Sequence, residues 1–306
     1  MSPEREFQVR KDDAGRRLDR ILRILFPRVP LGALYRALRV GQVRLGGRRC
    51  RPDRLVREGE IITVRGDLAS SDETAEGGAA RPAAQPGGGT RPALEALVVH
   101  RNPHFLALNK PRGLPTHGRD SLEGIVRRGL SADLPPSLSF TPGPLHRLDA
   151  GTTGLILFSA SLEGSHAVTA AFRERRVEKT YLAVFDGLIR GEATWRDVME
   201  RDGKEGSMAV SSLAHAKGLT LALCRPATGR YHQIRLQGAM HGHPLCGDRK
   251  HGGSPRLPWF LLHCASIRFC PPLFGVASLS APLPPDSERT LVALFGREVL
   301  QNLPSR

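Results

Sequence analysis

Residues 145–158 read LHRLDAGTTGLILF, and this stretch sets the chemistry that the rest of the chain has to explain. One carboxylate, Asp149, follows a histidine and an arginine, and small residues lead from it into an apolar run. Such a run is typical of a buried strand. No second carboxylate, metal-ligand set or phosphate-binding loop lies beside Asp149 in the sequence. The function of Asp149 therefore depends on what surrounds it in the fold.

On both sides of this stretch, short apolar runs predict the strands of a sheet. Residues 94–115 predict two strands with a turn at Asn102-Pro103, and residues 161–177 predict a helix. Further strands are predicted within residues 178–187, 209–226 and 260–269. Residues 231–242 predict a helix with Ile234 and Met240 facing inward. Because strands outnumber helices and occur in neighbouring runs, an α+β domain with a largely antiparallel sheet is expected from residue 93 to residue 306.

The N-terminal region predicts a second, smaller α+β domain over residues 1–66. Apolar residues at helical spacing predict helices that end at Pro27 and at Gly41. Residues 42–50 predict two short strands around Gly46-Gly47, and residues 59–66 predict another strand. Residues 67–92 are rich in Gly, Ala and Pro and lack aromatic residues, which favours a flexible linker.

The charge of the chain is strongly positive and unevenly distributed. The formal net charge is +15, and residues 1–66 hold 17 Lys or Arg against 8 Asp or Glu. Clustered positive charge favours an anionic partner, and RNA phosphates are held chiefly by such side chains. A solvated arginine face is the alternative. The arginines expected to dock RNA are Arg36, Arg39, Arg44, Arg48 and Arg49.

Two further features of the sequence indicate the cellular compartment. The five cysteines are odd in number and form no CxxC pair, which favours a reducing compartment. The first 25 residues are too charged for a signal peptide, and no run of 18 apolar residues occurs. We therefore expect a cytoplasmic protein that does not associate with a membrane.

Five segments together resemble one family, the RluA-like RNA pseudouridine synthases. They are NKPRGLPTHG (109–118), HRLDAGTTGLILF (146–158), EKTYLAVFDG (178–187), TGRYHQIRLQGAMHGHPLCGD (228–248) and LHCASIRFCPP (262–272). Residues 15–65 resemble the S-four type, or alpha-L, RNA-binding domain. The resemblance implies a pseudouridine-synthase fold with a mixed, largely antiparallel sheet and flanking helices. It also implies a member that modifies large-subunit ribosomal RNA.

The resemblance assigns a role to the lone carboxylate. In the family, the aspartate of HRLD is catalytic, which implies that Asp149 breaks the N1–C1′ bond of uridine as a nucleophile at C1′ or as a base at C2′. Both routes stay open. A cationic partner favours the ionised carboxylate, and the family pattern implies that this partner is Arg235. It also implies that Tyr181 stacks on the target base and assists proton removal from C5. No metal or other cofactor is implied.

Other residues in these motifs carry weaker expectations. Leu236 is expected as an apolar wall for the base or as plain core packing. Arg147 is expected to take the place of the extruded nucleotide, or to form a structural salt bridge. His146 is expected to be a hydrogen-bonding scaffold in the substrate site. Lys110 and Lys179 are expected to contact phosphates, with strand-edge lysines as the alternative.

The chain departs from the family pattern at two places, and it offers one rival site. Ala150-Gly151 stand where the family often has a charged pair, and His251 stands where many members have a tyrosine. Both departures put RNA contacts in doubt more than the chemistry. The residues of the rival site have metal-capable side chains, but their spacing fits no standard zinc pattern. They are His241, His243, Cys246, His251, His263 and Cys264.

The function expected from the sequence is thus uridine-to-pseudouridine isomerisation, most simply in large-subunit ribosomal RNA, by a monomer with no obligate protein partner. The same chemistry on transfer RNA is one alternative, and a non-catalytic RNA-binding ribosome-assembly factor is another. A glycosidase is less favoured, because such enzymes usually need two carboxylates.

Overall fold

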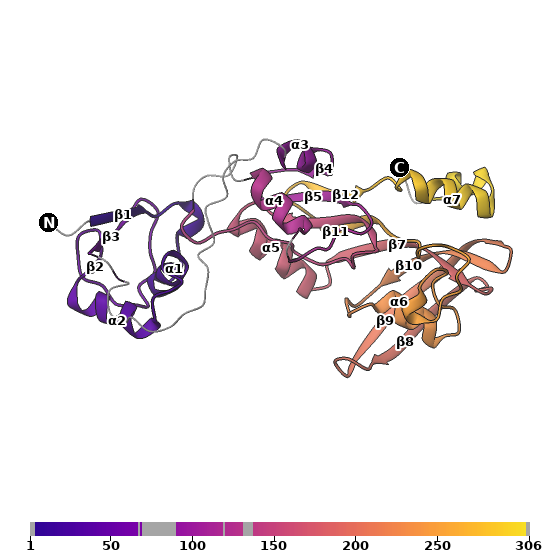
Figure 1. Ribbon diagram of the computed structural model, residues 1–306, viewed down its shortest axis with the longest axis horizontal. Coiled ribbons are helices and arrows are strands. Elements are labelled where there is room, and N and C mark those ends of the chain that lie inside the picture. Colours follow the sequence, from indigo (N-terminus) through magenta and orange to yellow (C-terminus); the bar gives the residue numbers. More distant parts are fainter. Residues whose placement is uncertain (1–3, 67, 69–89, 119, 131–136, 304–306) are drawn as a thin grey trace. The chain divides into compact units, whose positions relative to one another are not determined.

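The chain divides into two compact units. The computed structural model describes residues 4–66, 68, 90–118, 120–130 and 137–303. Unit 1 comprises residues 1–88 together with 130–141, and unit 2 comprises residues 89–129 together with 142–306 (Figure 1). Most of the predicted linker, residues 67–92, lies outside the described residues. Leu68 is described and is buried in the core of unit 1.

Unit 1 packs two helices beside a three-stranded antiparallel sheet of order β1-β3-β2. The helices begin and end close to where the sequence predicted, and Gly41 ends the second one in a left-handed conformation. Residues 46–50 form a turn with a single bridge from Leu45 to Arg48, so the second half of the predicted hairpin is not a strand. The elements are β1 (Glu4–Gln8), η1 (Lys11–Asp13), α1 (Leu18–Leu25), α2 (Leu31–Val40), β2 (Val43–Leu45) and β3 (Ile61–Arg65).

A segment distant in sequence completes unit 1. The carboxylate of Asp13 is fully buried. It accepts hydrogen bonds from the hydroxyls of Ser137 and Ser139 and from the backbone N–H groups of Leu138 and Ser139, at 2.8 to 3.1 Å. Burial alone would raise the pKa of Asp13, but these hydrogen bonds more than offset it, so the pKa lies below its usual value. The segment around Ser139 is therefore fastened to unit 1.

Unit 2 is built on a mixed sheet, in which the described residues form nine strands. The order is β4-β5-β6-β11-β7-β10-β9-β8, with β12 paired to β11. Neighbours are antiparallel except β6 and β11, which are parallel. The elements are α3 (Thr90–Glu95), β4 (Val98–Arg101), β5 (Phe105–Lys110), α4 (Leu122–Leu130), β6 (Thr153–Ser159), α5 (Leu162–Arg173), β7 (Val177–Asp186), β8 (Glu192–Met199), β9 (Lys204–Ala216), β10 (Leu219–Pro226), α6 (Gln233–Met240), η2 (Arg249–His251), β11 (Leu262–Leu273), β12 (Val276–Ser280), α7 (Pro285–Phe295) and η3 (Arg297–Asn302).

The centre of this sheet positions the loop that holds Asp149. Every residue of β6 is buried, as the apolar run predicted. Gly154 has φ +102°, and a Cβ there would lie 2.3 Å from the backbone oxygen of Cys264 on β11. Only glycine allows the two strands to approach this closely. The position of β6, and with it the loop before it, is fixed by that contact.

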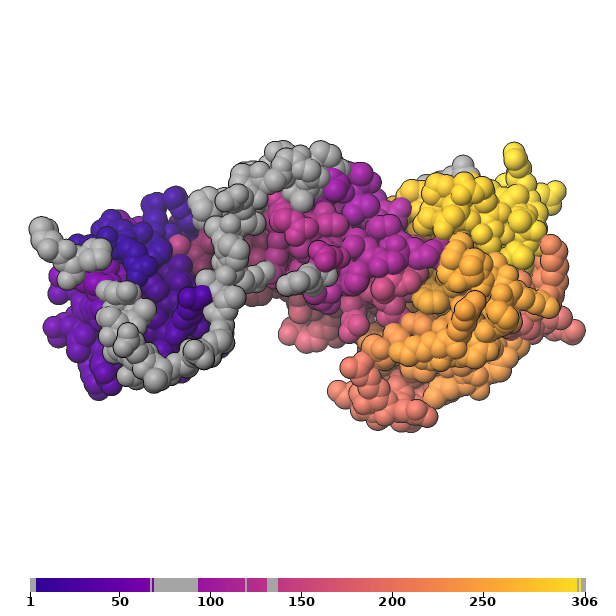
Figure 2. All heavy atoms as spheres, viewed as in Figure 1, coloured from indigo at the N-terminus to yellow at the C-terminus, as the bar shows by residue number. Residues whose placement is uncertain are grey.

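Helices cover different parts of unit 2. Ser161 caps α5 by accepting a hydrogen bond from the Gly164 backbone. Helix α6 packs against β8 and β10. Helix α7, yellow in Figure 2, lies on the surface of unit 2. Among the described residues, no helix is long and apolar enough to cross a membrane.

The sequence was wrong about one helix face and missed several elements. Met240 is 47% exposed rather than facing inward, whereas Ile234 is buried. Strand β8 was missed because charged residues interrupt its apolar residues, and only Trp195 and Met199 are buried along it. Strand β1, EREFQ, was missed because it is charged and largely exposed. Helix α4 was missed because two glycines interrupt its apolar spacing.

Candidate active site

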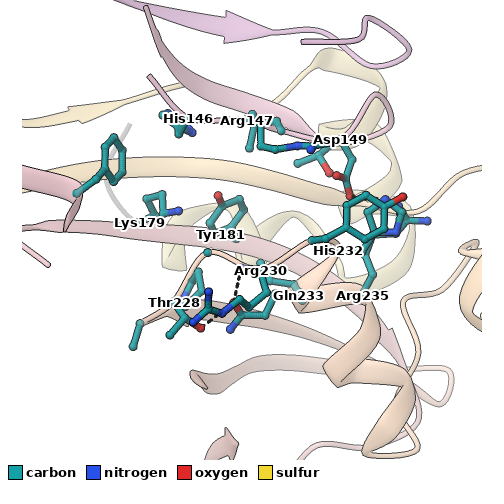
Figure 3. Close-up of a pocket in the computed structure, with 18 of the residues that line it drawn as sticks. His146, Arg147, Asp149, Lys179, Tyr181, Thr228, Arg230, His232, Gln233 and Arg235 are labelled. Atoms are coloured by element: carbon teal, nitrogen blue, oxygen red, sulfur yellow. Dashed lines mark hydrogen bonds and ion pairs between the residues drawn. The ribbon is translucent and has the colours of Figure 1, made fainter. Parts of the chain in front are cut away.

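A cleft of about 1030 Å³ opens in unit 2 beside the loop that holds Asp149. Its walls come from the loop before β6, the end of α5, strand β7 and the segment from Arg225 to Leu236. Figure 3 shows Asp149, His232 and Arg235 converging at one end of the cleft, with Lys179 and Tyr181 beside each other on β7. The cleft therefore joins three of the motifs that are far apart in the sequence.

Asp149 and Arg235 meet directly, as predicted. Arg235 Nη1 donates to Asp149 Oδ2 at 3.2 Å, and the Asp149 side chain is 19% exposed. The carboxylate is thus open to a ligand on one side while a cation holds it on the other. Arg235 thus places a positive charge beside the carboxylate that either route of catalysis would use.

Arg235 is itself held by a second carboxylate, Asp248, that sequence reasoning missed. Arg235 Nε and Nη2 donate to Asp248 Oδ2 and Oδ1 at 2.7 and 2.8 Å, and both side chains are buried. Burial lowers the pKa of Arg235, but hydrogen bonds and charge attraction from Asp248 and Asp149 outweigh it, so the net pKa is raised. The bidentate pair leaves Nη1 as the donor aimed at Asp149. The GD dipeptide that follows HGHPLC, within one of the family motifs, was the sequence feature that could have pointed to Asp248.

His232 lies next to the same carboxylate. It caps α6 in a left-handed conformation, φ 51°, which is uncommon for residues other than glycine. Its Nε2 is 3.6 Å from Asp149 Oδ2, and its Nδ1 is 3.0 Å from His251 Nε2. Burial, with the positive charge of Arg235 and Lys250, lowers the pKa of His232 to about 4 despite the attraction of Asp149. His232 is therefore neutral at pH 7, and Arg235 supplies the charge at this carboxylate.

Tyr181 and Lys179 line the cleft from β7. Tyr181 is 6% exposed, and its pKa is raised well above 10 by burial, with contributions from Cys264 and Asp149. It therefore presents a ring face and a protonated hydroxyl, which disfavours a phenolate base at C5. Lys179 has a pKa lowered by burial, and its Nζ lies 5.7 Å from the Phe172 ring centroid.

Lys110 does not face the cleft, and the expectation that it contacts phosphate is wrong. It is fully buried, and its Nζ donates to the carbonyl oxygens of Pro111, Leu114 and Ala150 at 2.8 to 3.0 Å. Burial lowers its pKa to about 8, although the charge of Asp149 opposes the shift. Lys110 thus ties the loop after β5 to the residue that follows Asp149.

The remaining predicted residues lie in or beside the cleft. The backbone N–H of Leu157 donates to His146 Nε2 at 3.1 Å, and burial lowers the His146 pKa to about 3. His146 is therefore a neutral side chain that accepts a hydrogen bond from β6, as expected of a scaffold residue. Arg147 is exposed, makes no ion pair among the described residues, and lies 5.6 Å from the Tyr231 ring. Leu236 is half-buried and lines the cleft.

The predicted docking arginines lie on unit 1. Arg36, Arg39, Arg48 and Arg49 are exposed. Arg44 is half-buried, and it donates to the carbonyl oxygens of Gly41 and Gly47, each at 3.2 Å, so part of its bonding capacity holds the turn after β2. Four of the five guanidinium groups are thus presented on the surface of the unit.

The rival metal constellation has other roles in the structure. His241 Nε2 is 3.2 Å from Asp197 Oδ2, and His243 Nδ1 is 3.0 Å from the Asp186 backbone oxygen. His263 bonds Thr153 and the Ala281 backbone. Over the described ranges, no group of three or more His, Cys, Asp or Glu side chains is arranged to hold a metal ion.

Comparison with known proteins shows which family this chain is similar to. The family model described as RNA pseudouridylate synthase matches residues 104–239, which contain the loop of Asp149, strand β7 and most of α6. Over these residues the chain is similar to the RNA pseudouridylate synthases, and this match supports the RluA-like family that the motifs predicted. The chain is therefore an isomerase that acts on RNA, as the sequence predicted.

Curated relatives span nearly the whole synthase. Ribosomal large subunit pseudouridine synthase C of Salmonella typhi and that of Escherichia coli K12 are each 29% identical over 92% of this chain and 94% of their own. The protein of the same name from Vibrio parahaemolyticus is 28% identical over 93% of this chain and 94% of its own.

Solved structures confirm the predicted fold of the synthase. Human RNA Pseudouridylate Synthase Domain Containing 4 aligns with a TM-score of 0.57 and 21% identity, over 70% of this chain and 97% of that one. Human RNA Pseudouridylate Synthase Domain Containing 1 aligns with a TM-score of 0.51 and 23% identity, over 61% of this chain and 83% of that one.

Proposed function

We propose that this synthase isomerises a uridine of large-subunit ribosomal RNA, with Asp149 as the reacting carboxylate. The observation that carries the proposal is the Asp149–Arg235 pair in a cleft lined by cationic side chains. The names of the curated relatives support ribosomal RNA over transfer RNA. The intact pair of Asp149 and Arg235 favours an enzyme over a binding-only factor.

The main requirement of this reaction is one correctly positioned carboxylate. The N1–C1′ bond of uridine breaks, the uracil turns, C5 bonds to C1′, the C5 hydrogen leaves as a proton and N1 gains one. Asp149 serves as nucleophile at C1′ or as base at C2′, and in both routes Arg235 holds the reacting carboxylate in place. Tyr181 supplies a ring face for the extruded base, and Leu236 supplies an apolar wall.

The other predicted residues supply RNA contacts around this centre. Arg147 is exposed at the cleft, which supports a role in occupying the space of the extruded nucleotide. Lys179 faces the same cleft and is suited to a phosphate. The exposed arginines of unit 1 hold RNA backbone in the manner expected of an S-four-type domain. We propose that the synthase acts as a cytoplasmic monomer.

The test is tritium release from uridine-5-labelled RNA, comparing wild type with Asp149→Asn. Pseudouridine formation expels the C5 hydrogen, so release reports the reaction directly. We expect release from unmodified large-subunit ribosomal RNA by wild type and none by Asp149→Asn. Asp197→Asn is the matched control, because Asp197 bonds Gln237 outside the cleft.

Each alternative gives a different result. Release from transfer RNA but not from ribosomal RNA would replace the substrate. No release from either RNA, with binding intact, would point to a binding factor. Equal release by wild type and Asp149→Asn would remove Asp149 from the reaction.

A further inference from the structure

An aromatic side chain beside the reaction centre has no role in the isomerisation proposed above. Tyr231 is half-buried, lines the cleft and precedes His232 in the turn into α6. Its ring stacks on the His232 imidazole with centroids 3.8 Å apart and planes inclined by 16°. The imidazole therefore covers one face of the tyrosine ring and holds the ring in a fixed orientation.

The opposite face of the ring is covered by a cation. The guanidinium carbon of Arg201 lies 4.0 Å from the ring centroid. An imidazole stacked at 3.8 Å leaves no room for it on the same face, so Arg201 occupies the other one. Arg201 is exposed at the turn between β8 and β9, and its neighbour Asp202 lies 3.8 Å from Arg230.

Two more cations stand around the same ring. Arg147 and Lys250 lie 5.6 and 5.8 Å from its centroid, and both are exposed. In the part of the chain that the structure describes, neither these two nor Arg201 makes an ion pair. An aromatic face ringed by unpaired cations matches the arrangement that binds single-stranded RNA, in which rings stack on bases and cations contact the backbone.

We propose that Tyr231 is a stacking platform for a nucleobase adjacent to the target uridine. The base replaces Arg201 on the ring face opposite His232, because base–aromatic stacking is the stronger of the two contacts. The released guanidinium then lies beside the phosphate of that nucleotide. The imidazole of His232 lies between this ring and Asp149, so the platform takes a neighbouring nucleotide and not the uridine itself. This inference rests on the proposed function of the same cleft.

The experiment separates stacking from charge through the salt dependence of RNA binding. Full-length wild type, Tyr231→Leu, Tyr231→Phe and Arg201→Gln are compared on unmodified large-subunit ribosomal RNA. Filter binding gives Kd over a series of salt concentrations, and tritium release gives KM and kcat. Tyr231→Leu should raise Kd and KM about tenfold, with kcat changed less than about threefold.

The salt slopes give the distinguishing readout. Stacking releases no counterions, so Tyr231→Leu should keep the wild-type slope of log Kd against log salt. Arg201→Gln should lower that slope by about one, as expected when the protein neutralises one phosphate fewer. Tyr231→Phe, which keeps the ring, should restore the wild-type KM to within about twofold.

Several outcomes would overturn the platform. Unchanged Kd and KM in Tyr231→Leu would remove Tyr231 from RNA binding. A fall in kcat with KM unchanged would show that Tyr231 only orients His232. A Kd increase in Tyr231→Phe equal to that in Tyr231→Leu would assign the contact to the hydroxyl. If wild type released no tritium, the proposed substrate would be wrong, and the binding arm would still decide the role of the ring.

Discussion

At the scale of single residues, the site is a chain of alternating charges. Asp248 holds Arg235 through two hydrogen bonds, and Arg235 presents its remaining donor to Asp149. Two carboxylates on one buried guanidinium explain how a cation is kept in the interior, since a buried charge needs hydrogen-bonded partners. Asp248 acts through Arg235 and is a positioning residue.

Replacing Asp248 should therefore lower activity without touching the reacting carboxylate. Asp248→Asn keeps the size of the side chain but removes the charge and one of its two acceptors for Arg235. Misplacing a catalytic group by about 1 Å can cost on the order of 100-fold in rate. We expect kcat for tritium release to fall about 10- to 100-fold while Kd for RNA changes little.

Asp197→Asn again serves as the control, because Asp197 also bonds a residue of α6 but lies outside the cleft. An equal loss of kcat in both variants would show that any disturbance of α6 is enough to lower kcat. That result would withdraw the specific role of Asp248.

At the scale of secondary-structure elements, the parallel contact between β6 and β11 governs where Asp149 lies. Gly154→Ala would place a Cβ against the Cys264 backbone, at a φ that alanine rarely adopts. Strain of this kind typically costs about 2 kcal/mol or more. We expect a lower free energy of unfolding and reduced tritium release, measured by urea denaturation and by the release assay.

Gly143→Ala is the matched control for that strand. A Cβ at Gly143 would meet nothing within 4 Å, and its φ is not positive. This variant should be neutral or slightly more stable, because alanine restricts the unfolded chain. If the two variants were equally stable, the close approach of β6 and β11 would not be a constraint.

The elements also show what the sequence could and could not predict. Strands β5, β6, β7 and β10 were predictable because their apolar runs are nearly continuous. Strand β1 was not, because EREFQ is largely exposed. The pairing of Asp149 with Arg235 was implied by family resemblance alone, since 86 residues separate them. The burial of Lys110 was not predictable, because the three carbonyls that hold it come from two different loops.

At the scale of the whole molecule, charge on unit 1 should govern how tightly RNA is held. A variant with glutamine at Arg36, Arg39, Arg48 and Arg49 should bind unmodified ribosomal RNA more weakly. The slope of log Kd against log salt should decrease by about one for each phosphate that the variant no longer neutralises. Filter binding of the full-length chain measures both quantities.

Glutamine at Arg190, Arg256, Arg289 and Arg297, four exposed arginines of unit 2 outside the cleft, provides the control with the same change in net charge. If both quadruple variants shifted Kd and slope equally, total charge and not the unit 1 surface would explain the affinity.

The hydrogen bonds to Asp13 predict that unit 1 loosens in acid. The folded-state pKa of Asp13 is lowered, so its stabilisation is complete above the unfolded pKa near 3.8 and is lost as the pH falls through the lower folded value. In wild type, amide protection at Leu138 and Ser139, corrected for intrinsic exchange rates, should fall below about pH 4. Asp13→Asn should show reduced protection already at pH 6 and little change on acidification.

The expected loss at pH 6 is about 1 to 3 kcal/mol, the usual cost of leaving buried donors unsatisfied. Asp53→Asn, at an exposed aspartate of the same unit, should match wild type throughout. Protection in Asp13→Asn that follows the wild-type acid profile would assign the effect to another group.

The attachment of residues 137–141 to unit 1 has a consequence for how such a gene can be rearranged. A docking domain that is contiguous in sequence can be lost, duplicated or exchanged by one recombination event at its boundary. Here, removing the codons for residues 1–88 would leave Ser137, Leu138 and Ser139, which are encoded 124 to 126 codons after Asp13, without the Asp13 carboxylate that they bind. Exchange of unit 1 would therefore require a matched change in the segment that precedes the motif of Asp149.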